Sequence, residues 1–329
     1  MIQMSQRFII TENCNASCPH CFNANERDGG TIDADLLIEY LRKNSMYLPT
    51  SDFRMMGGEP TLHPRFSDIV DEAAKHVRLI KVYSNGLKLK EVTKDHNVMM
   101  AHFNDKLIYI LNGYTFSPRM ATSQELQKYV KRLAVHMVVT TDGVDKMIEK
   151  THRFLDLYPF IYTVISPDSQ VNIFDEDTLN AYREAWMKAV KSIVPRTRNI
   201  GFDINIDHSF PMCFYTQDMI EELARHDLEG LHMKKQNCCA ETRMGLTDWN
   251  WDLYYCNQTR IKIGSVLNDE GQPKLIPEII EMINEVGTRI KVDKIKELAS
   301  KCRDCAALAM CKAGCFYNTM KRECGTASC

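Results

Sequence analysis

The stretch RFIITENCNASCPHC, residues 7–21, decides how the rest of the chain is interpreted. Its apolar, β-branched start, Arg7–Ile10, predicts a strand, and the loop that follows carries Cys14, Cys18 and Cys21. A closed structural zinc site takes four ligands, and no fourth cysteine follows until late in the chain. The triplet therefore predicts a metal centre with one position open for chemistry. The alternative is a zinc site completed by a histidine, His20 or His63, or by a distant residue.

Cysteine is the unusual component of the composition, with 13 among 329 residues. The chain has neither a signal-peptide core nor an apolar run of about 18 residues, so we expect a cytoplasmic protein without a membrane span. In that reducing compartment, cysteines hold metal more often than they form disulfides. The 41 basic and 43 acidic side chains leave a net charge of -2, which argues against a nucleic-acid-binding surface.

Short apolar runs alternate with longer amphipathic stretches, which predicts an α/β fold with a parallel sheet and ligands at the carboxyl ends of its strands. The expected strands are Arg7–Ile10, Phe53–Met56, Leu79–Tyr83, Leu107–Leu111, Val135–Thr140, Ile161–Ile165 and Ile200–Ile206. The expected helices are Ala34–Asn44, Arg65–His76, Asp175–Val194, Asp218–His226, Ile276–Val286 and Val292–Ala299. The pattern changes near residue 230, so we expect domains at 1–230 and 231–329.

Three further motifs follow predicted strands. The first is Gly57-Gly58-Glu59-Pro60, where glycines allow the backbone to approach a ligand closely, although a turn alone would also use them. The second is Tyr83-Ser84-Asn85-Gly86, and the third is Asn112 before Gly113, which an ordinary turn explains equally well. All three belong at the same sheet edge as the cysteine loop.

The C-x3-C-x2-C loop after the first strand, with GGEP one βα unit later, resembles the signature of radical S-adenosylmethionine (radical SAM) enzymes. The resemblance implies a partial (β/α)6 barrel and a 4Fe-4S cluster held by the three cysteines, with SAM on its open iron. It also implies one-electron cleavage of SAM to a 5′-deoxyadenosyl radical, which abstracts a substrate hydrogen. The residues implied to contact SAM are Gly57, Gly58, Glu59, Pro60, Ser84, Asn85, Asn112 and His20, the last at a position that is commonly aromatic.

The C-terminal cysteines resemble the SPASM extension of radical SAM enzymes, which holds two auxiliary 4Fe-4S clusters. Carried over by position, one cluster would use Cys302, Cys305, Cys311 and Cys324. The other would use Cys239, Cys256 and Cys315, with its fourth ligand open between Cys238, Cys329 and none. The chain departs from the pattern at Trp251, where the extension has glycine. A zinc-ribbon-like structural domain is the alternative for this region.

Two residues bear on the reaction. Cys256 precedes Asn257, whereas sulfatase-maturing relatives have an aspartate base there, so dehydrogenation by that route is disfavoured. Cys213 is a candidate hydrogen donor, with a buried inert thiol as the alternative.

The resemblance implies modification of a ribosomally made peptide by crosslinking, epimerisation or oxidation. The implied partner is a reductant such as flavodoxin or ferredoxin. Because few residues precede the cysteine loop, we expect a leader-peptide-binding module to be a separate protein or to be absent. The alternatives are a radical SAM dehydrogenase, epimerase or decarboxylase acting on a small molecule, such as an amino sugar or cofactor precursor, and a non-enzymatic electron-transfer or zinc-binding module.

Overall fold

The computed structural model describes residues 5–18, 21, 29–115, 128, 130, 133–157, 161–167, 175–198, 204–206, 214–225, 245–255 and 261–297. Its strands are β1 (Ser5–Thr11), β2 (Asp52–Gly57), β3 (Leu79–Ser84), β4 (Leu107–Asn112), β5 (Leu133–Val139), β6 (Ile161–Pro167), β7 (Ile204–Ile206), β8 (Leu246–Thr247), β9 (Asp252–Tyr254) and β10 (Lys262–Ser265). Its helices are α1 (Ala34–Lys43), α2 (Phe66–His76), α3 (Leu89–Val92), α4 (His96–Phe103), α7 (Val144–Leu157), α8 (Glu176–Arg198), α9 (Gln217–Arg225) and α11 (Ile276–Glu297).

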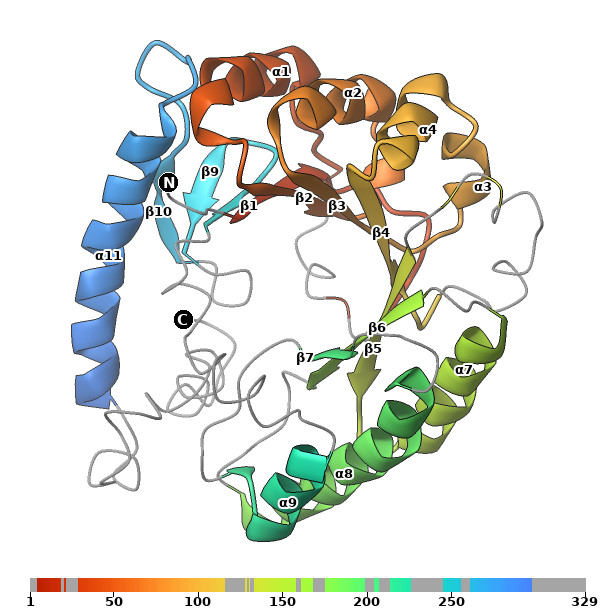
Figure 1. Cartoon of the computed structure of the whole chain (residues 1–329). Coiled ribbons are helices and arrows are strands. Elements are labelled where there is room, and N and C mark those ends of the chain that lie inside the picture. Colours follow the sequence, from red (N-terminus) through yellow and green to blue (C-terminus); the bar gives the residue numbers. More distant parts are fainter. Residues whose placement is uncertain are drawn as a thin grey trace. The chain divides into compact units, whose positions relative to one another are not determined.

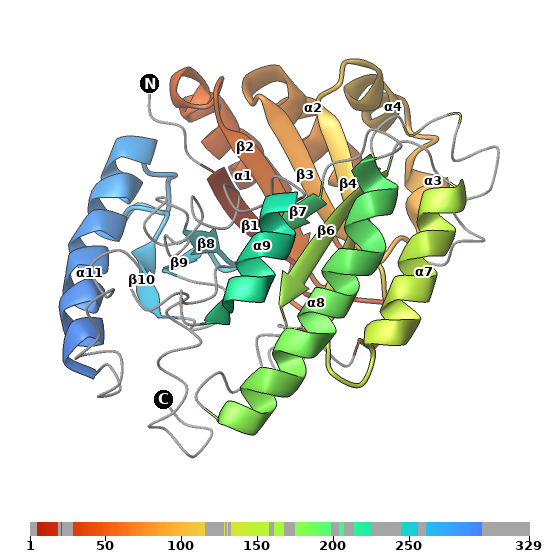
Figure 2. The same ribbon diagram turned by 60° about the horizontal axis from the view of Figure 1, so that its bottom comes forward.

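The chain divides into two compact units, one of residues 1–135 and 243–286 and the other of residues 136–242 and 287–329. In the first unit the strands lie in the order β10-β9-β8-β1-β2-β3-β4. Strands β1 to β4 are parallel, as predicted, and helices α1, α2 and α4 cover one face of them (Figure 1). In the second unit β6 pairs in parallel with β7, and α7 lies beside α8 (Figure 2).

The first unit's core forms because alternate strand residues are apolar and face the helices. Phe8 on β1 packs against Phe53 on β2 and Tyr40 on α1, with ring centroids 5.4 and 5.3 Å apart. Helix α1 begins where Asp33 accepts hydrogen bonds from the backbone N–H groups of Asp35 and Leu36, a standard N-cap. Parallel pairing sets the register of β1 to β4, so their carboxyl ends meet at one edge.

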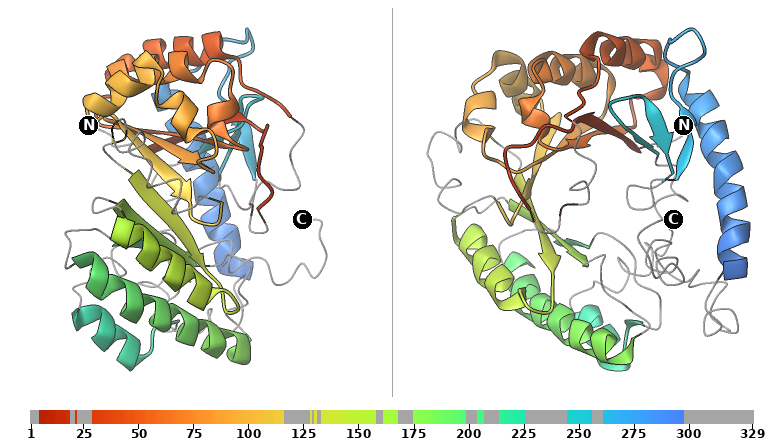
Figure 3. Two further views of the ribbon diagram at one scale, coloured as in Figure 1. Left: turned by 90° about the vertical axis from the view of Figure 1, so that its right-hand side faces the viewer. Right: turned by 180° about the vertical axis from the view of Figure 1, so that it is seen from behind.

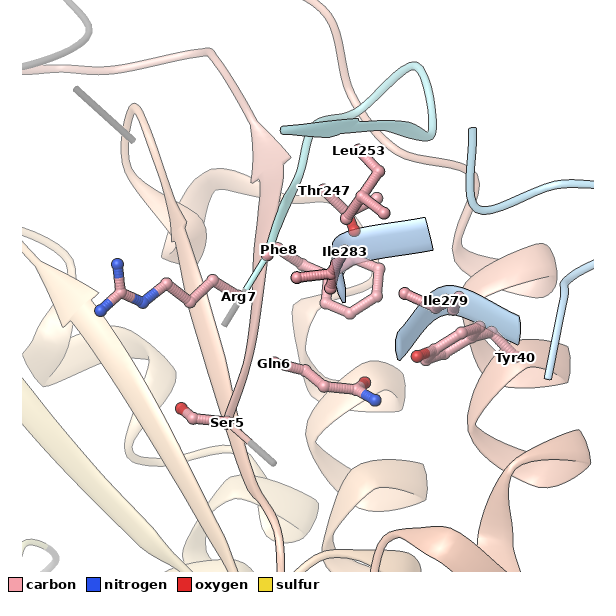
Figure 4. Close-up of a pocket in the computed structure, with 10 residues that line it drawn as sticks. Ser5, Gln6, Arg7, Phe8, Tyr40, Thr247, Leu253, Ile279 and Ile283 are labelled. Atoms are coloured by element: carbon pink, nitrogen blue, oxygen red, sulfur yellow. The ribbon is translucent and has the colours of Figure 1, made fainter. Parts of the chain in front are cut away.

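A small cavity of about 20 Å³ lies beside the amino end of β1, far along the strand from the cysteine loop (Figure 4). Phe8, Leu253 and Ile283 line it, and the buried amide of Gln6 points to the same side of β1. That volume has room for about one water molecule. Ser5 and Arg7 point to the opposite side of β1, which separates the two faces of the sheet (Figure 4).

One predicted break in the chain is wrong. The sequence indicated separate helices at Ile276–Val286 and Val292–Ala299, but α11 runs without interruption from Ile276 to Glu297 (Figure 3). Gly287 costs only about 1 kcal/mol in a helix interior, and Pro277 lies in the first turn of α11, where a proline is tolerated. The predicted domain boundary near residue 230 lies outside the described residues and stays a prediction. None of the helices within the described ranges is both long and apolar enough to cross a bilayer.

Candidate functional site

The three predicted cysteines lie in the loop that leaves the carboxyl end of β1. Cys14, Cys18 and Cys21 carry half-buried thiols, none of which is in a disulfide. The backbone N–H of Cys21 donates to the carbonyl of Cys18 at 3.2 Å, so the second and third cysteines share a tight turn. The loop therefore presents three thiols from one short segment at the edge where parallel strands end.

Hydrogen bonds close the base of the cysteine loop. The backbone N–H of Glu12 donates to the carbonyl of Gly30 at 2.8 Å, and that of Ile32 donates to Ile10 at 2.9 Å. A side chain cannot be added at Gly30, because its Cβ would lie 2.0 Å from the ring of Trp249. The loop thus leaves and returns at fixed points.

The GGEP segment runs directly alongside the start of the cysteine loop. The N–H of Gly58 donates to the carbonyl of Thr11, and that of Glu59 donates to Asn13, both at 2.8 Å. A Cβ at Gly57 would lie 2.1 Å from the Thr11 oxygen, and one at Gly58 would lie 2.4 Å from the Asn13 oxygen. The glycines are required by this approach of two backbone segments, while the predicted approach to a ligand stays a prediction.

Glu59 ties the end of β2 to the end of β3. Its carboxylate is fully buried, at 0% exposure, and accepts hydrogen bonds on both oxygens. Oε1 accepts from the backbone N–H and hydroxyl of Thr61, at 3.2 and 2.5 Å, and from the hydroxyl of Ser84 at 2.8 Å. Oε2 accepts from the backbone N–H of Asn85 at 2.6 Å. The charge is therefore satisfied within the protein, and two predicted motifs are locked together.

Two asparagines reach from neighbouring strands to the cysteine sulfurs. At the end of β3, the side-chain N–H of Asn85 donates to Cys14 Sγ at 3.8 Å. At the end of β4, Asn112 donates to Cys18 Sγ at 3.6 Å. The same amide group of Asn85 also donates to Asn15 at 2.8 Å. Hydrogen bonds to cysteine sulfur are one of the means by which proteins tune iron–sulfur centres.

The same asparagines orient two exposed apolar side chains that sequence reasoning missed. The side-chain oxygen of Asn85 accepts from the N–H of Leu87, and that of Asn112 accepts from Tyr114, both at 2.9 Å. Leu87 is 43% exposed and Tyr114 is 62% exposed. The repeated Asn-Gly-apolar order, at 85–87 and 112–114, was the available sequence signal. It places an apolar side chain beside each asparagine.

His63, one of the candidate zinc ligands, has both ring nitrogens in use. Nδ1 accepts from the backbone N–H of Arg65 at 3.1 Å, so Nε2 carries the proton and donates to the Ile32 carbonyl at 3.0 Å. Burial lowers the pKa of His63, which favours the neutral ring. His63 therefore acts as a structural tie between the cysteine loop and the segment after GGEP, and it has no lone pair for a metal.

The donor set at this edge fits an iron–sulfur cluster. Thiolates select zinc or iron–sulfur chemistry, and a three-thiolate set leaves one position open. Within the described ranges, no three His, Cys, Asp or Glu side chains converge as the ligands of one metal ion must. Thiolates on a cluster bind separate irons, so they do not need that convergence. The remaining predicted site residues, His20, Cys213, Cys238, Cys239, Cys256, Cys302, Cys305, Cys311, Cys315 and Cys324, lie outside the described residues.

Comparison with known proteins agrees with this geometry. Residues 8–155 match the model of the Radical SAM superfamily. It is 29% identical over 168 residues to the tungsten-containing aldehyde ferredoxin oxidoreductase cofactor-modifying protein of Pyrococcus furiosus, covering 45% of this chain and 47% of that one. It is 32% identical over 85 residues to the mycofactocin maturase MftC of Mycobacterium ulcerans, covering 24% and 22%. The chain thus matches less than half the length of these curated relatives.

Solved structures share the fold over nearly the whole chain. SuiB of Streptococcus suis bound to S-adenosylmethionine matches with a TM-score of 0.61 and 13% identity, over 96% of this chain and 74% of SuiB. Native anSMEcpe with bound AdoMet and a peptide matches with a TM-score of 0.61 and 15% identity, over 95% and 89%. At such identities the likeness concerns the fold alone.

Proposed function

We propose that this chain is a radical SAM enzyme whose reactive centre is the Cys14, Cys18 and Cys21 loop. The observation that carries the proposal is the attachment of this loop to GGEP, with Asn85 and Asn112 at its sulfurs. When bound there, a 4Fe-4S cluster and SAM supply a one-electron reductive cleavage that generates a 5′-deoxyadenosyl radical for hydrogen abstraction. We further propose that the parallel sheet belongs to a partial (β/α)6 barrel.

The chain's own residues would bind, orient and shield in this reaction. The three thiolates would hold three irons of the cluster, and the two asparagine amides would stabilise negative charge on sulfur. Glu59 would hold GGEP against the end of β3, because its buried carboxylate is hydrogen-bonded to Ser84 and Asn85. Leu87 and Tyr114 would exclude water at the edge of the site.

The proposed substrate is a ribosomally made peptide, modified by crosslinking, epimerisation or oxidation. Two names support this class: the MftC relative is a maturase, and SuiB, which shares the fold, has been solved with the precursor peptide SuiA. The second candidate is a small molecule such as a cofactor precursor. It is favoured by the Pyrococcus furiosus relative, which is named as a cofactor-modifying protein.

The C-terminal cysteines are proposed to form a SPASM domain over residues 231–329, following a radical SAM core over 1–230. It would hold two auxiliary clusters through Cys302, Cys305, Cys311 and Cys324 and through Cys239, Cys256 and Cys315, with Cys238 as a further candidate. Cys213 would donate hydrogen to the substrate radical. A flavodoxin or ferredoxin would supply electrons in the cytoplasm, and a separate protein would bind any leader peptide.

Anaerobic reconstitution tests the reactive centre. Protein supplied with iron, sulfide, reductant and SAM is expected to release 5′-deoxyadenosine, and the triple variant Cys14→Ala, Cys18→Ala, Cys21→Ala is expected to lose one cluster and this release. The matched control is Cys213→Ala, which should keep SAM cleavage while its product is lost or diverted. Undiminished cleavage in the triple variant would refute the proposal.

Deuterium transfer separates the two substrate classes. A deuterated precursor peptide should pass label into 5′-deoxyadenosine if the enzyme modifies peptides. Transfer only from a labelled small molecule would favour the second candidate instead.

A further inference from the structure

Three cationic side chains lie next to one another on neighbouring strands of the first unit. The register of the parallel sheet pairs Arg7 on β1 with Arg54 on β2, and Arg54 with Lys81 on β3. Neighbouring strands are about 4.8 Å apart, so the three residues form a cross-strand row. We call Arg7, Arg54 and Lys81 the cation row.

The cation row lies on the sheet face away from α1. Figure 4 shows Arg7 on the opposite side of β1 from Phe8, and Phe8 packs against Tyr40 of α1. Because side chains alternate along strands, Arg54 and Lys81 share the face of Arg7. Their sequence neighbours Phe53 and Ile80, both 0% exposed, belong to the helix-covered face.

Arg54 and Lys81 carry more positive charge than Asp52, the carboxylate that pairs with Lys81, can neutralise. Asp52 binds Lys81 at 2.7 Å, but it also binds Arg78 at 2.5 Å. The Nε of Arg54 is buried and makes no hydrogen bond within the part of the chain that the structure describes. Like charges directly opposite each other across strands are destabilising, and the side chains of Arg54 and Lys81 are both half-buried, where an anion would reduce their repulsion. Burial and the charge of Arg54 both lower the pKa of Lys81, against the effect of Asp52.

We propose that the cation row is a subsite for an oxyanion, either a carboxylate or a phosphate group. Lys81 keeps 23% of its side chain exposed, so a ligand can reach it from solvent. A planar guanidinium binds either oxyanion with two parallel hydrogen bonds, and a neighbouring ammonium adds a point charge.

The position of the row indicates which molecule carries the anion. Arg54 precedes Gly57 by three residues on β2, which is about 10 Å along the strand. A substrate with its reacting carbon near the GGEP end could reach the row with an acidic group. The assignment of the anion to the substrate rests on the proposed function, whereas the subsite itself rests on strand register and charge.

Thermal unfolding of the full chain with reconstituted clusters tests the subsite. Inorganic phosphate and acetate are compared with chloride at equal pH and ionic strength. At about ten times the dissociation constant, the preferred anion should raise the unfolding temperature by about 2 °C. A larger response to phosphate indicates a phosphate group on the natural ligand, and a larger response to acetate indicates a carboxylate.

Substitutions in the cation row test whether it causes the rise in unfolding temperature. Arg54→Gln and Lys81→Gln should each lose at least half of it, and Arg54→Lys should keep most of it. Arg65→Gln, which removes an exposed arginine paired with Asp35 and Asp68, is the matched control and should respond as wild type does.

Two results would overturn the subsite: phosphate and acetate acting no differently from chloride on wild type, or an unchanged response in Arg54→Gln and Lys81→Gln. SAM cleavage is measured on the same samples. Its absence would count against the proposed function and leave the anion response as an independent result.

Discussion

Two charged groups near the end of β2 have opposite environments. Glu59 is fully buried, and four hydrogen bonds from neighbouring groups satisfy its carboxylate. Arg54 lies five residues earlier, with a buried Nε that makes no hydrogen bond in the described part of the chain and a second cation, Lys81, opposite it. The carboxylate of Glu59 has its hydrogen-bond donors within the fold, whereas the Nε of Arg54 has no acceptor among the described residues.

The difference separates scaffold from binding site. A buried charge with all its partners fixes the segments that supply them, so Glu59 determines where GGEP and Asn85 lie. A half-buried guanidinium with a buried Nε that makes no hydrogen bond, as in Arg54, costs stability unless a ligand supplies the acceptor. The carboxyl ends of the strands therefore form a hydrogen-bonded scaffold for the cysteine loop, whereas the cation row would be stabilised by a bound anion.

The largest loss of stability is expected when the buried carboxylate of Glu59 is removed. Glu59→Leu should lower the free energy of unfolding by about 3 to 5 kcal/mol, because the donors from Thr61, Ser84 and Asn85 lose their acceptor. Urea unfolding measures the loss. Glu91→Ala, which breaks the exposed pair with Lys88, should cost less than about 1 kcal/mol. Equal costs would mean that burial of Glu59 has no energetic consequence.

A smaller loss is expected at the contact between GGEP and the cysteine loop. Gly58→Ala should cost about 2 to 3 kcal/mol and reduce bound iron, because the new Cβ would lie 2.4 Å from the carbonyl oxygens of Glu12 and Asn13. Gly271→Ala is the control, since its positive φ brings strain but no atom lies within 4 Å. It should cost about 1 kcal/mol and leave the iron content unchanged. Normal iron content in Gly58→Ala would contradict the role of this contact.

Removing a hydrogen bond to cysteine sulfur should change the reduction potential of the proposed cluster more than it changes the stability of the fold. Asn112→Asp replaces the donor at Cys18 by a negative acceptor, so the reduction potential should fall by on the order of 50 mV, about 1 kcal/mol. A potentiometric titration followed by EPR measures it. Asn104→Asp adds the same charge at the end of α4, before β4 begins, and should leave the potential within error of wild type. Equal potentials in both variants would remove Asn112 from the set of tuning residues.

Much of the scaffold around the cysteine loop could be predicted from the sequence, because it depends on where β1 to β4 end. The apolar runs located β1 to β4 within one or two residues, and parallel strands bring their carboxyl ends together. Cys14, Glu59, Asn85 and Asn112 could therefore be expected at one edge. Which atoms meet could not be predicted, because hydrogen bonds such as that of Glu59 to Ser84 depend on strand register.

Features that depend on distant packing were not predictable. Trp251 has φ 65, a left-handed conformation that favours glycine, and the extension that this region resembles has glycine at that position. The strain persists because the buried Trp251 ring packs against Phe8 and Tyr40, at 6.2 and 6.3 Å. The sequence pattern identified the departure from glycine but not its compensation. The cation row was missed for a related reason, since Arg7, Arg54 and Lys81 are far apart along the chain.

The smallest effect is the pH dependence of stability that Lys81 of the cation row contributes when no ligand is bound. Burial, and then the neighbouring Arg54, lower the pKa of Lys81 in the folded protein, although Asp52 acts in the opposite direction. In the unfolded chain the pKa is about 10.4, so between the two values the unfolded state binds more protons. The contribution of Lys81 to the free energy of unfolding must therefore increase as the pH rises toward about 10.

Urea unfolding at pH 8 and pH 10 measures this increase as the difference between wild type and Lys81→Gln. We expect wild type to gain up to about 1 kcal/mol relative to the variant over this range, because deprotonation of Lys81 removes a charge that burial, and then the neighbouring Arg54, disfavour. Lys146→Gln, an exposed lysine on α7, should follow wild type. Saturating the row with its preferred anion should abolish the gain, since the anion favours protonated Lys81. An equal pH response in wild type and Lys81→Gln would show that burial and Arg54 do not lower the pKa of Lys81 in the folded protein, and the contrast with Glu59 would then fail.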